Sequence, residues 1–345
     1  MSGEVFDARV PAPTGAGTLA SGVGPECLTV RDAYLDAAPL APGDTVALVA
    51  ASGLGTRERV DYAVELLESW GLTVKVGEHL LDGHPRASYL AATDAARRED
   101  LVKAWCDPDV DAVITARGGY GAMRLLDGID WDEMRAAAFR KDGRPKLLTG
   151  SSDVTALHES FRVHLDVPTL FCPMVANDVF ATSAFIREDV HRWLFEPWRG
   201  RLIVGPAAEI LQPGMARGRF TGGTLSLVSA SIGAPEFAVP DGSLLFLEDV
   251  DEDAYSIDNL LVQLARSGRL SAASGLVLGS WQNCAPLDEV KALFAEYLDE
   301  YLGGLDIPVL WQQGFGHDPN AVSLPMNVDG VLDLTDGSIS LTVGV

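Results

Sequence analysis

The sequence predicts an α/β protein with two domains: an N-terminal domain of βαβ units on a parallel sheet, and a smaller C-terminal α/β domain. Short apolar runs alternate with segments of helical spacing from about residue 44 onward, and strands that alternate with helices form parallel sheets. The length of 345 residues exceeds the ~150 residues typical of one domain, which favours two. Apolar residues make up 47% of the chain, which is enough to fill sizeable cores.

The N-terminal domain is expected to alternate strands and helices along the chain. A helix beginning near Thr56 has Val60, Val64 and Leu67 at helical spacing and Gly71 as its stop. Strands are expected at 44–50, 72–76, 110–115 and 147–149, with further helices at 93–106 and from about 153 to 164. Because ligands bind at the carboxyl ends of parallel strands, chemistry is expected in the loops that follow them.

Composition suggests where the domains begin and end. Residues 1–42 are rich in Gly, Ala and Pro and predict a flexible N-terminal arm, followed by the N-terminal domain at 43–195. Residues 196–215 hold three prolines without clear periodicity, which predicts a linker. The C-terminal domain is expected at 216–345 and starts with the segments 216–220 and 222–233. Strands are expected at 243–248, 275–279, 308–311 and within 331–345, and a helix at 255–266.

Charge and cysteine content argue against several classes of function. A formal net charge of −23 disfavours binding to nucleic acid or to an anionic membrane, because both need a basic face. No apolar run approaches the ~20 residues of a membrane span, and the first residues lack a secretory-signal pattern, so a cytoplasmic location is expected. The four cysteines (Cys27, Cys106, Cys172 and Cys284) are widely spaced, and neither a metal site, a disulfide framework nor a cofactor is expected.

A candidate nucleophile follows the fourth expected strand, in Gly150-Ser151-Ser152-Asp153. On a tight strand-to-helix turn, the hydroxyl of Ser152 would be held clear of the sheet, beside a helix N-terminus that stabilises negative charge. The turn is not the nucleophile elbow G-x-S-x-G, because Val154 stands two residues after Ser152. Taken alone, the turn is explained more simply as a helix cap.

A glycine-rich loop, Arg117-Gly118-Gly119-Tyr120-Gly121, follows the third expected strand. Its glycines let the backbone approach a ligand closely or present free N–H groups to an oxyanion, although a plain turn has the same composition. The spacing is not that of a phosphate-binding P-loop. Arg117 and Tyr120 are candidate substrate-binding residues, and Arg117 could equally form a surface ion pair.

A carboxylate and a histidine complete the set of candidates. Glu248 and Asp249 end an apolar strand, which places them at the rim of a sheet, although the acids that follow also fit a solvated surface. His317 lies in the loop Gly-Phe-Gly-His-Asp after a later strand, and His158 and His164 are its rivals as a base. Nucleophile, base, acid and oxyanion donors would then all lie in loops that follow strands.

This combination of segments resembles the LD-carboxypeptidase family of serine peptidases, which includes muramoyltetrapeptide carboxypeptidases and microcin C self-immunity proteins. The matching segments are ARGGYGAMRLLDGIDW at 116–131, LLTGSSDVTALH at 147–158, CPMVAN at 172–177, GGTLSLVSASIGAP at 222–235, LLFLEDVDEDAYSIDNLLVQL at 244–264 and GFGHDPNAVSLPM at 314–326. They occur in the family's order and span nearly all of residues 44–345.

The resemblance implies a function and assigns roles to residues. It implies a catalytic triad of Ser152, Glu248 and His317, an active site in the cleft between the two domains, a homodimer and no metal. Backbone N–H groups of Gly118 or Gly119 and of Asp153 would form the oxyanion hole. The implied reaction is hydrolysis of the amide bond between an L-centred diamino acid and the terminal D-Ala of a murein tetrapeptide, a step in cell-wall recycling.

Three positions depart from the family pattern. Ser151 stands where an aromatic residue is frequent, Asn259 where Arg is usual, and Asn327 where Gly is common. None belongs to the implied triad, but Asn259 and Asn327 leave the substrate preference open.

Other functions remain open at this point. The nearest is hydrolysis of a microcin-type peptidyl-nucleotide amide, for which Trp198, Trp281 or Trp311 could stack on adenine. A non-catalytic ligand-binding protein on the same scaffold would carry an unreactive Ser152. An α/β-hydrolase esterase has the same chain order of serine, acid and histidine, but the missing glycine after Ser152 argues against it.

Overall fold

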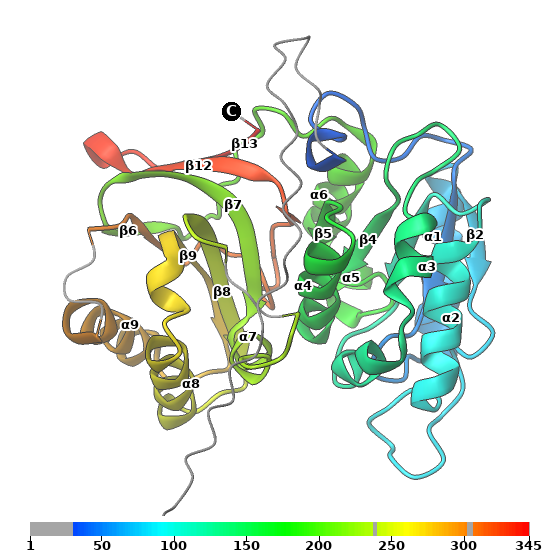
Figure 1. The fold of residues 1–345 in the computed structure, drawn as a ribbon, viewed down its shortest axis with the longest axis horizontal. Coiled ribbons are helices and arrows are strands. Elements are labelled where there is room, and N and C mark those ends of the chain that lie inside the picture. Colours follow the sequence, from blue (N-terminus) through cyan, green and yellow to red (C-terminus); the bar gives the residue numbers. More distant parts are fainter. Residues whose placement is uncertain (1–29, 237–239, 302–305, 345) are drawn as a thin grey trace, which may run out of the picture.

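Two β-sheets covered by helices form the chain in the computed structural model, which describes residues 30–236, 240–301 and 306–344 (Figure 1). The first sheet has six strands in the order β11-β5-β4-β3-β1-β2, and the second has seven in the order β13-β12-β7-β8-β9-β10-β6. The predicted α/β class with two domains is confirmed. Within the described ranges, no helix has both the length and the apolar character needed to cross a bilayer.

The first sheet is parallel except at one edge. Its strands are β1 (Thr45–Val49), β2 (Thr73–Val76), β3 (Ala112–Thr115), β4 (Leu147–Gly150), β5 (Thr169–Phe171) and β11 (Leu324–Met326). All neighbouring pairs are parallel apart from β11, which pairs antiparallel with β5. Every residue of β3 and β4 is buried, as expected for parallel strands covered on both faces.

Helices of the first half cover both faces of this sheet. They are α1 (Arg57–Ser69), α2 (Asp94–Cys106), α3 (Trp131–Ala136), α4 (Thr155–His164), α5 (Asp178–Thr182) and α6 (Ala184–Phe195). The predicted helix starts are correct because Thr56 and Thr93 act as N-caps, each accepting a hydrogen bond from a backbone N–H three residues later. On one face, Trp105 of α2 packs edge-to-face on Phe161 of α4 with ring centroids 4.7 Å apart.

The second sheet mixes parallel and antiparallel pairs. Its strands are β6 (Glu209–Gln212), β7 (Met215–Thr224), β8 (Ser243–Val250), β9 (Ala273–Gln282), β10 (Val309–Trp311), β12 (Asp329–Asp333) and β13 (Ser340–Val343). β7, β8, β9 and β10 pair in parallel, and β6, β12 and β13 add antiparallel edges. The helices α7 (Leu225–Ala230), α8 (Ala254–Arg266) and α9 (Leu287–Glu296) contribute to the apolar core on one face of this sheet.

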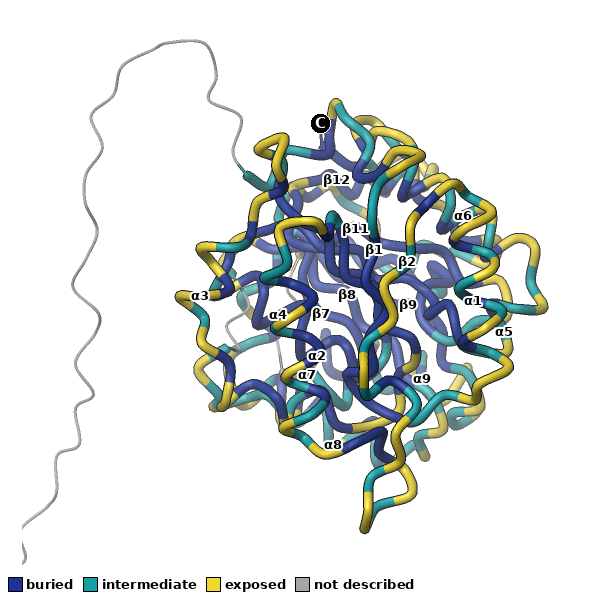
Figure 2. Tube along the Cα trace, turned by 90° about the vertical axis from the view of Figure 1, so that its right-hand side faces the viewer, coloured by how far each residue is buried: buried dark blue, intermediate teal, exposed yellow. Residues whose placement is uncertain are grey.

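One apolar core joins the two sheets. Phe315 packs edge-to-face on Phe171 of β5, at 6.0 Å between ring centroids, and on Phe246 of β8, at 5.6 Å. All three rings are buried in the same cluster, and Figure 2 shows the buried strands of both sheets running through the centre of the molecule. The loop that carries Phe315, and His317 after it, is therefore anchored where the two sheets meet.

Three segments differ from the sequence-based expectation. Residues 30–42 are not a flexible arm: Tyr34 is fully buried and its hydroxyl donates to the Pro145 carbonyl at 2.5 Å. Residues 1–29 of the predicted arm lie outside the described residues. The predicted linker 196–215 contains the edge strand β6, which at four residues is too short to show a period. β11 belongs to the first sheet, although it follows β10 of the second sheet in the chain, because Leu324 and its neighbours pair with β5. Local sequence does not encode such a long-range pairing.

Candidate active site

Ser152 sits on the turn between β4 and α4 in a strained backbone conformation. Its φ of 59° lies in the left-handed region, which costs a residue with a side chain about 1–2 kcal/mol. Such strain is concentrated at functional sites. Neither Ser151 nor Ser152 forms a side-chain cap on the helix that follows, so helix capping does not explain this serine.

Glu248 and His317 are joined directly. Glu248 lies near the end of β8, and its side chain has no exposed surface. Its Oε2 lies 2.7 Å from His317 Nδ1, and its Oε1 accepts a hydrogen bond from the Thr224 hydroxyl at 2.5 Å. The backbone N–H of His317 donates to Ser280 Oγ at 2.9 Å. With Nδ1–H donated to the carboxylate, the other ring nitrogen, Nε2, is free to accept a proton.

The protonation of His317 is controlled by two opposing effects. Burial alone would lower the pKa of the imidazole, but the negative charge and hydrogen bond of Glu248 outweigh it and raise the pKa above its usual 6.5. Asp249 and Asp251 act in the same direction with smaller effects. A histidine held in this way stabilises its own positive charge once it has taken a proton.

Ser152 and His317 line one cavity of about 460 Å³, which also contacts Gly118, Gly119 and Arg117. Ser152 and the glycine loop belong to the first sheet, whereas Glu248 and His317 come from the second. Among the described residues, no hydrogen bond links Ser152 to His317. The structure thus brings candidate nucleophile and candidate base to the same cavity from residues 165 positions apart in sequence.

The glycine loop faces Ser152 closely. A Cβ placed on Gly118 would lie 3.1 Å from Ser152 Cβ and 3.3 Å from its Oγ, so the close approach requires glycine. Gly119 has a φ of 107°, which glycine adopts without strain. The Gly118 carbonyl accepts a hydrogen bond from Gly53 N–H at 3.0 Å, which fixes the loop against the turn after β1.

The two candidate substrate-binding residues differ in position. Arg117 is exposed, lines the cavity and donates to the Leu54 carbonyl at 2.8 Å. Tyr120 is exposed and packs against Tyr89 with ring centroids 5.9 Å apart, but it is absent from the described residues that line the cavity.

The rival histidines lie elsewhere. His158 is buried, and its two ring nitrogens are within 2.9 Å of Thr169 Oγ1 and the Gly150 carbonyl; burial lowers its pKa to about 4. Because Nε2 faces a carbonyl, which can only accept a hydrogen bond, Nε2 carries the proton. It donates to the carbonyl of Gly150, two residues before Ser152. His164 stacks on Trp131 with ring centroids 4.4 Å apart, away from the cavity.

The positions that left substrate preference open lie outside this cavity. Asn327 is buried, and its amide donates to the Val167 carbonyl at 3.1 Å. Asn259 is an exposed residue of α8. The three tryptophans considered for stacking on adenine, Trp198, Trp281 and Trp311, are buried in cores and do not line the cavity.

Sequence reasoning missed several residues of this site. Arg59, Asp178 and Asp251 line the cavity, and Arg59 Nε donates to Asp178 Oδ1 at 2.6 Å. Asp251 lies in an acidic run that is typical of a solvated surface, and its φ of 60° cannot be predicted from the sequence. Thr224 ends the glycine-glycine-threonine segment, the one local signal that could have identified it.

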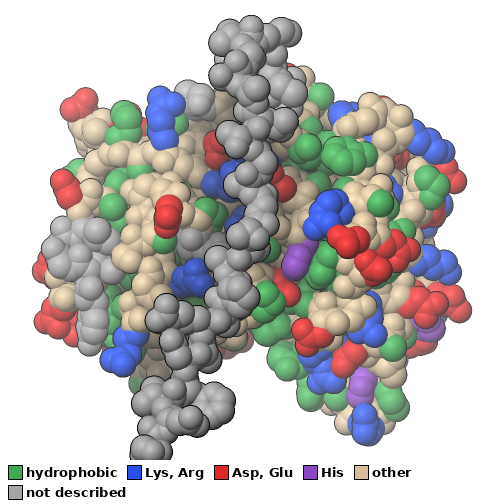
Figure 3. Space-filling view, viewed as in Figure 1, with side chains coloured by type: hydrophobic (Ala, Val, Ile, Leu, Met, Phe, Trp, Pro, Cys, Tyr) green, Lys and Arg blue, Asp and Glu red, His purple; other side chains and the backbone are tan. Residues whose placement is uncertain are grey.

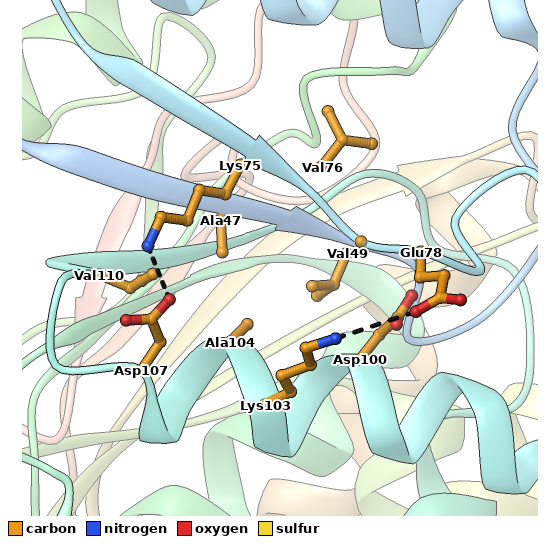
Figure 4. A pocket seen from close by; sticks show the side chains of 11 residues that line it. Ala47, Val49, Lys75, Val76, Glu78, Asp100, Lys103, Ala104, Asp107 and Val110 are labelled. Atoms are coloured by element: carbon orange, nitrogen blue, oxygen red, sulfur yellow. Dashed lines mark hydrogen bonds and ion pairs between the residues drawn. The ribbon is translucent and has the colours of Figure 1, made fainter.

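A smaller cavity lies away from the candidate residues. A cavity of about 200 Å³ beside β2 is rimmed by the ion pairs Lys75–Asp107 and Lys103–Glu78 and contains none of the candidate residues (Figure 4). Acidic and basic side chains are interspersed on the face shown in Figure 3. Within the described ranges, no three histidine, cysteine, aspartate or glutamate side chains gather as metal ligands.

Comparison with known proteins places the chain among peptidases. The sequence model of the LD-carboxypeptidase N-terminal domain matches residues 46–172, and that of the C-terminal domain matches residues 217–332. A putative carboxypeptidase of Streptomyces coelicolor is 44% identical over 88% of this chain and 95% of its own. A probable murein peptide carboxypeptidase of Bacillus subtilis is 31% identical over 88% of this chain and 93% of its own.

Solved structures share the fold. Muramoyltetrapeptide carboxypeptidase from Oxalobacter formigenes superposes with a TM-score of 0.71 at 25% identity, covering 87% of this chain and 99% of that one. The protein MccF in complex with glutamyl sulfamoyl guanosine superposes with a TM-score of 0.75 at 22% identity, covering 89% and 98%.

Proposed function

Because this chain belongs to the LD-carboxypeptidase family, we propose that it is a serine carboxypeptidase acting on murein tetrapeptides. It hydrolyses the amide bond between an L-centred diamino acid and terminal D-Ala. The observation that carries the proposal is the Glu248–His317 pair, 2.7 Å apart, on the same cavity as the strained Ser152. The Bacillus subtilis relative is named a probable murein peptide carboxypeptidase, and the Oxalobacter formigenes protein a muramoyltetrapeptide carboxypeptidase.

The proposed mechanism begins with proton transfer. His317 Nε2 takes the proton of Ser152 as the serine Oγ attacks the scissile carbonyl carbon. Glu248 holds the imidazole in the required tautomer and stabilises the imidazolium that forms. Thr224 and Ser280 orient the pair. The Thr224 hydroxyl donates to Glu248 Oε1, the oxygen that does not face His317, and the Ser280 hydroxyl accepts from the backbone N–H of His317. Ser152 and His317 must approach each other when substrate binds, as catalytic contacts often tighten in the complex.

The tetrahedral intermediate places negative charge on the former carbonyl oxygen. Backbone N–H groups of Gly118 or Gly119 and of Asp153 are proposed to stabilise it, each donor contributing about 3 kcal/mol to the transition state. His317 then gives its proton to the leaving nitrogen of D-Ala. A water molecule attacks the acyl-enzyme, with His317 again as base, and frees Ser152.

Arg117 is the proposed partner of the terminal carboxylate. It lines the cavity beside Gly118 and Gly119, and a guanidinium suits a carboxylate in charge and geometry. Tyr120, which lies outside the lining, is retained only as a contact for parts of the substrate beyond the cavity. A homodimer in the cytoplasm remains a prediction from the family resemblance.

A second substrate class is a peptidyl-nucleotide amide, because a solved structure of the same fold is MccF bound to glutamyl sulfamoyl guanosine. The same triad would cleave either amide. The buried positions of Trp198, Trp281 and Trp311 leave none of them available to stack on a base, so the murein peptide is favoured.

The decisive experiment is mass spectrometry of the protein incubated with a murein tetrapeptide ending in D-Ala. Wild type is expected to release D-Ala, and Ser152→Ala to release none while keeping its thermal unfolding temperature. Release by Ser152→Ala would contradict the assigned nucleophile. Release from an aminoacyl sulfamoyl nucleotide but not from the tetrapeptide would instead support the second substrate class.

A further inference from the structure

The carboxylate of Asp153 ties together three loops that surround Ser152. Asp153 is 1% exposed. Its Oδ2 accepts a hydrogen bond from the Ser52 hydroxyl at 2.5 Å and from the Ala122 backbone N–H at 2.7 Å. Ser52 belongs to the loop after β1, Ala122 directly follows the glycine loop after β3, and Asp153 directly follows Ser152. One buried side chain thus fixes the relative positions of three strand ends.

A buried arginine fastens the same loops from behind. The Arg97 side chain of α2 is 1% exposed; its Nη1 donates to the Ala51 carbonyl and, at 3.0 Å, to the Gly121 carbonyl. Ala51 precedes Ser52, and Gly121 precedes Ala122, so Arg97 holds the carbonyls next to the two groups that bind Asp153. Arg97 also places a positive charge near the buried Asp153 carboxylate.

The glycine loop is therefore held at both ends. Gly53 N–H binds the Gly118 carbonyl at 3.0 Å, and a Cβ on Gly53 would lie only 2.8 Å from that oxygen. At the other end, Arg97 holds the Gly121 carbonyl and Asp153 holds the Ala122 N–H. The glycines between these points have no side chain that could fix them. Donors to an oxyanion act strongly only when they are already oriented before the reaction.

We propose that Asp153, acting with Ser52 and Arg97, is a positioning residue that orients the Gly118–Gly119 backbone toward the oxyanion formed at Ser152. Asp153 thus has two roles: its backbone N–H is a proposed oxyanion donor, and its carboxylate fixes the opposite donor. This inference rests on the proposed serine mechanism. It goes beyond that mechanism by assigning buried residues that do not line the cavity to stabilisation of the transition state.

We call the contacts of Asp153 with Ser52 and Ala122, together with those of Arg97, the clamp. The test is a set of substitutions that loosen this clamp without changing a residue of the triad. Ser52→Ala removes one hydrogen bond to Asp153 and leaves the Ala122 bond in place. Asp153→Asn keeps an oxygen acceptor but removes the charge, and Asp153→Ala removes both bonds. Ser160→Ala is the matched control, because its hydroxyl is equally buried but binds only the Ala156 carbonyl within α4.

The expected result is a loss in kcat at nearly constant KM. Losing one oriented oxyanion donor lowers kcat by about 100- to 1000-fold, so Asp153→Ala should approach that range. Ser52→Ala and Asp153→Asn should lie between it and the wild type, and Ser160→Ala should match the wild type. Tetrapeptide affinity, measured by calorimetry with Ser152→Ala added to each variant, should stay within about twofold, because the clamp acts on the transition state.

A purely structural role would give a different result. Ser52→Ala with a lower unfolding temperature and an unchanged kcat would overturn the proposal, as would a rise in KM at constant kcat. If Asp153→Ala does not fold, Ser52→Ala and Asp153→Asn still decide. Phosphonylation of Ser152 by a fluorophosphonate separates this proposal from the substrate assignment. Slower phosphonylation in the clamp variants supports the clamp even if the tetrapeptide is not cleaved, and equal rates in all variants overturn it.

Discussion

Ser152 keeps a costly backbone conformation because its surroundings leave it little alternative. The Gly150 carbonyl before it is held by His158 and the Asp153 carboxylate after it by Ser52 and Ala122. A sequence pattern indicates a serine between a strand and a helix, but it does not show that the residues on both sides of this serine are held by hydrogen bonds. At the residue scale, the difference between a helix cap and a candidate nucleophile lies in contacts with residues from other loops.

Glu248→Gln should lower kcat by about 1000- to 10,000-fold, as in other triads that lose the negative charge of the acid. The amide oxygen would face the Thr224 hydroxyl, leaving the amide N–H to face His317 Nδ1. That contact favours the tautomer protonated on Nε2, which cannot take a proton from Ser152. Steady-state kinetics with tetrapeptide measures the loss, and Asp253→Asn, which removes a nearby exposed acid, is the control. Activity within tenfold of wild type would contradict Glu248 as the acid.

The pH dependence of kcat/KM should follow His317. The base must be neutral, so activity should rise with pH through the pKa of His317, which Glu248 raises above 6.5 despite burial. In Glu248→Gln the acidic limb of the residual activity should shift to lower pH, because the imidazolium loses its negative partner and the pKa of His317 falls. Profiles of both enzymes from pH 5 to 9 test the sign, and a shift of the acidic limb to higher pH in the variant would exclude this assignment.

At the scale of elements, the loop after β10 places the backbone of Gly316 directly against the side chain of Glu248. Gly316 has a φ of 104°, and a Cβ there would lie 2.2 Å from Glu248 Oε2. The preceding Phe315 is locked between Phe171 and Phe246, so the loop cannot retreat without opening the shared core. The position of His317 is thus decided by packing on both sides.

Gly316→Ala should reduce both stability and activity. The positive φ costs about 1–2 kcal/mol, and the Cβ must displace either Glu248 or the loop that carries His317. Gly337→Ala is the matched control, with a φ of 72° and nothing within 4 Å of the added Cβ. Urea unfolding and kcat should separate them, since Gly337→Ala should lose stability alone. Full activity in a folded Gly316→Ala would show that the loop tolerates the clash.

At the scale of the molecule, a buried carboxylate links the two sheets. Glu159 on α4 binds Arg162 at 2.7 Å through Oε2, and its Oε1 accepts from the Thr221 hydroxyl of β7 at 2.6 Å. Helix α4 begins just after Ser152, and β7 leads to Thr224. This contact therefore helps to fix the nucleophile side of the cleft relative to the acid side.

Glu159→Ala should destabilise the protein by about 3–5 kcal/mol, because it removes one partner of a buried ion pair. It should also lower activity by loosening the two halves of the site. Denaturant unfolding gives the free energy, and Asp132→Ala is the control, since Asp132 pairs with Arg135 at the same spacing but on the surface and should change stability little. Equal effects of the two changes would refute a special role for the contact.

Much of this architecture is fixed by local sequence. Periodicity and caps such as Thr56 define the helices, and apolar runs define the parallel strands, because each depends on neighbours within a few residues. Motif order identified the family and the candidate residues Ser152, Glu248 and His317. Only the tertiary structure decided which of three histidines faces the cavity, that β11 crosses to the first sheet, and that residues 30–42 are packed. Those outcomes depend on contacts between residues tens to hundreds of positions apart, and no local pattern records them.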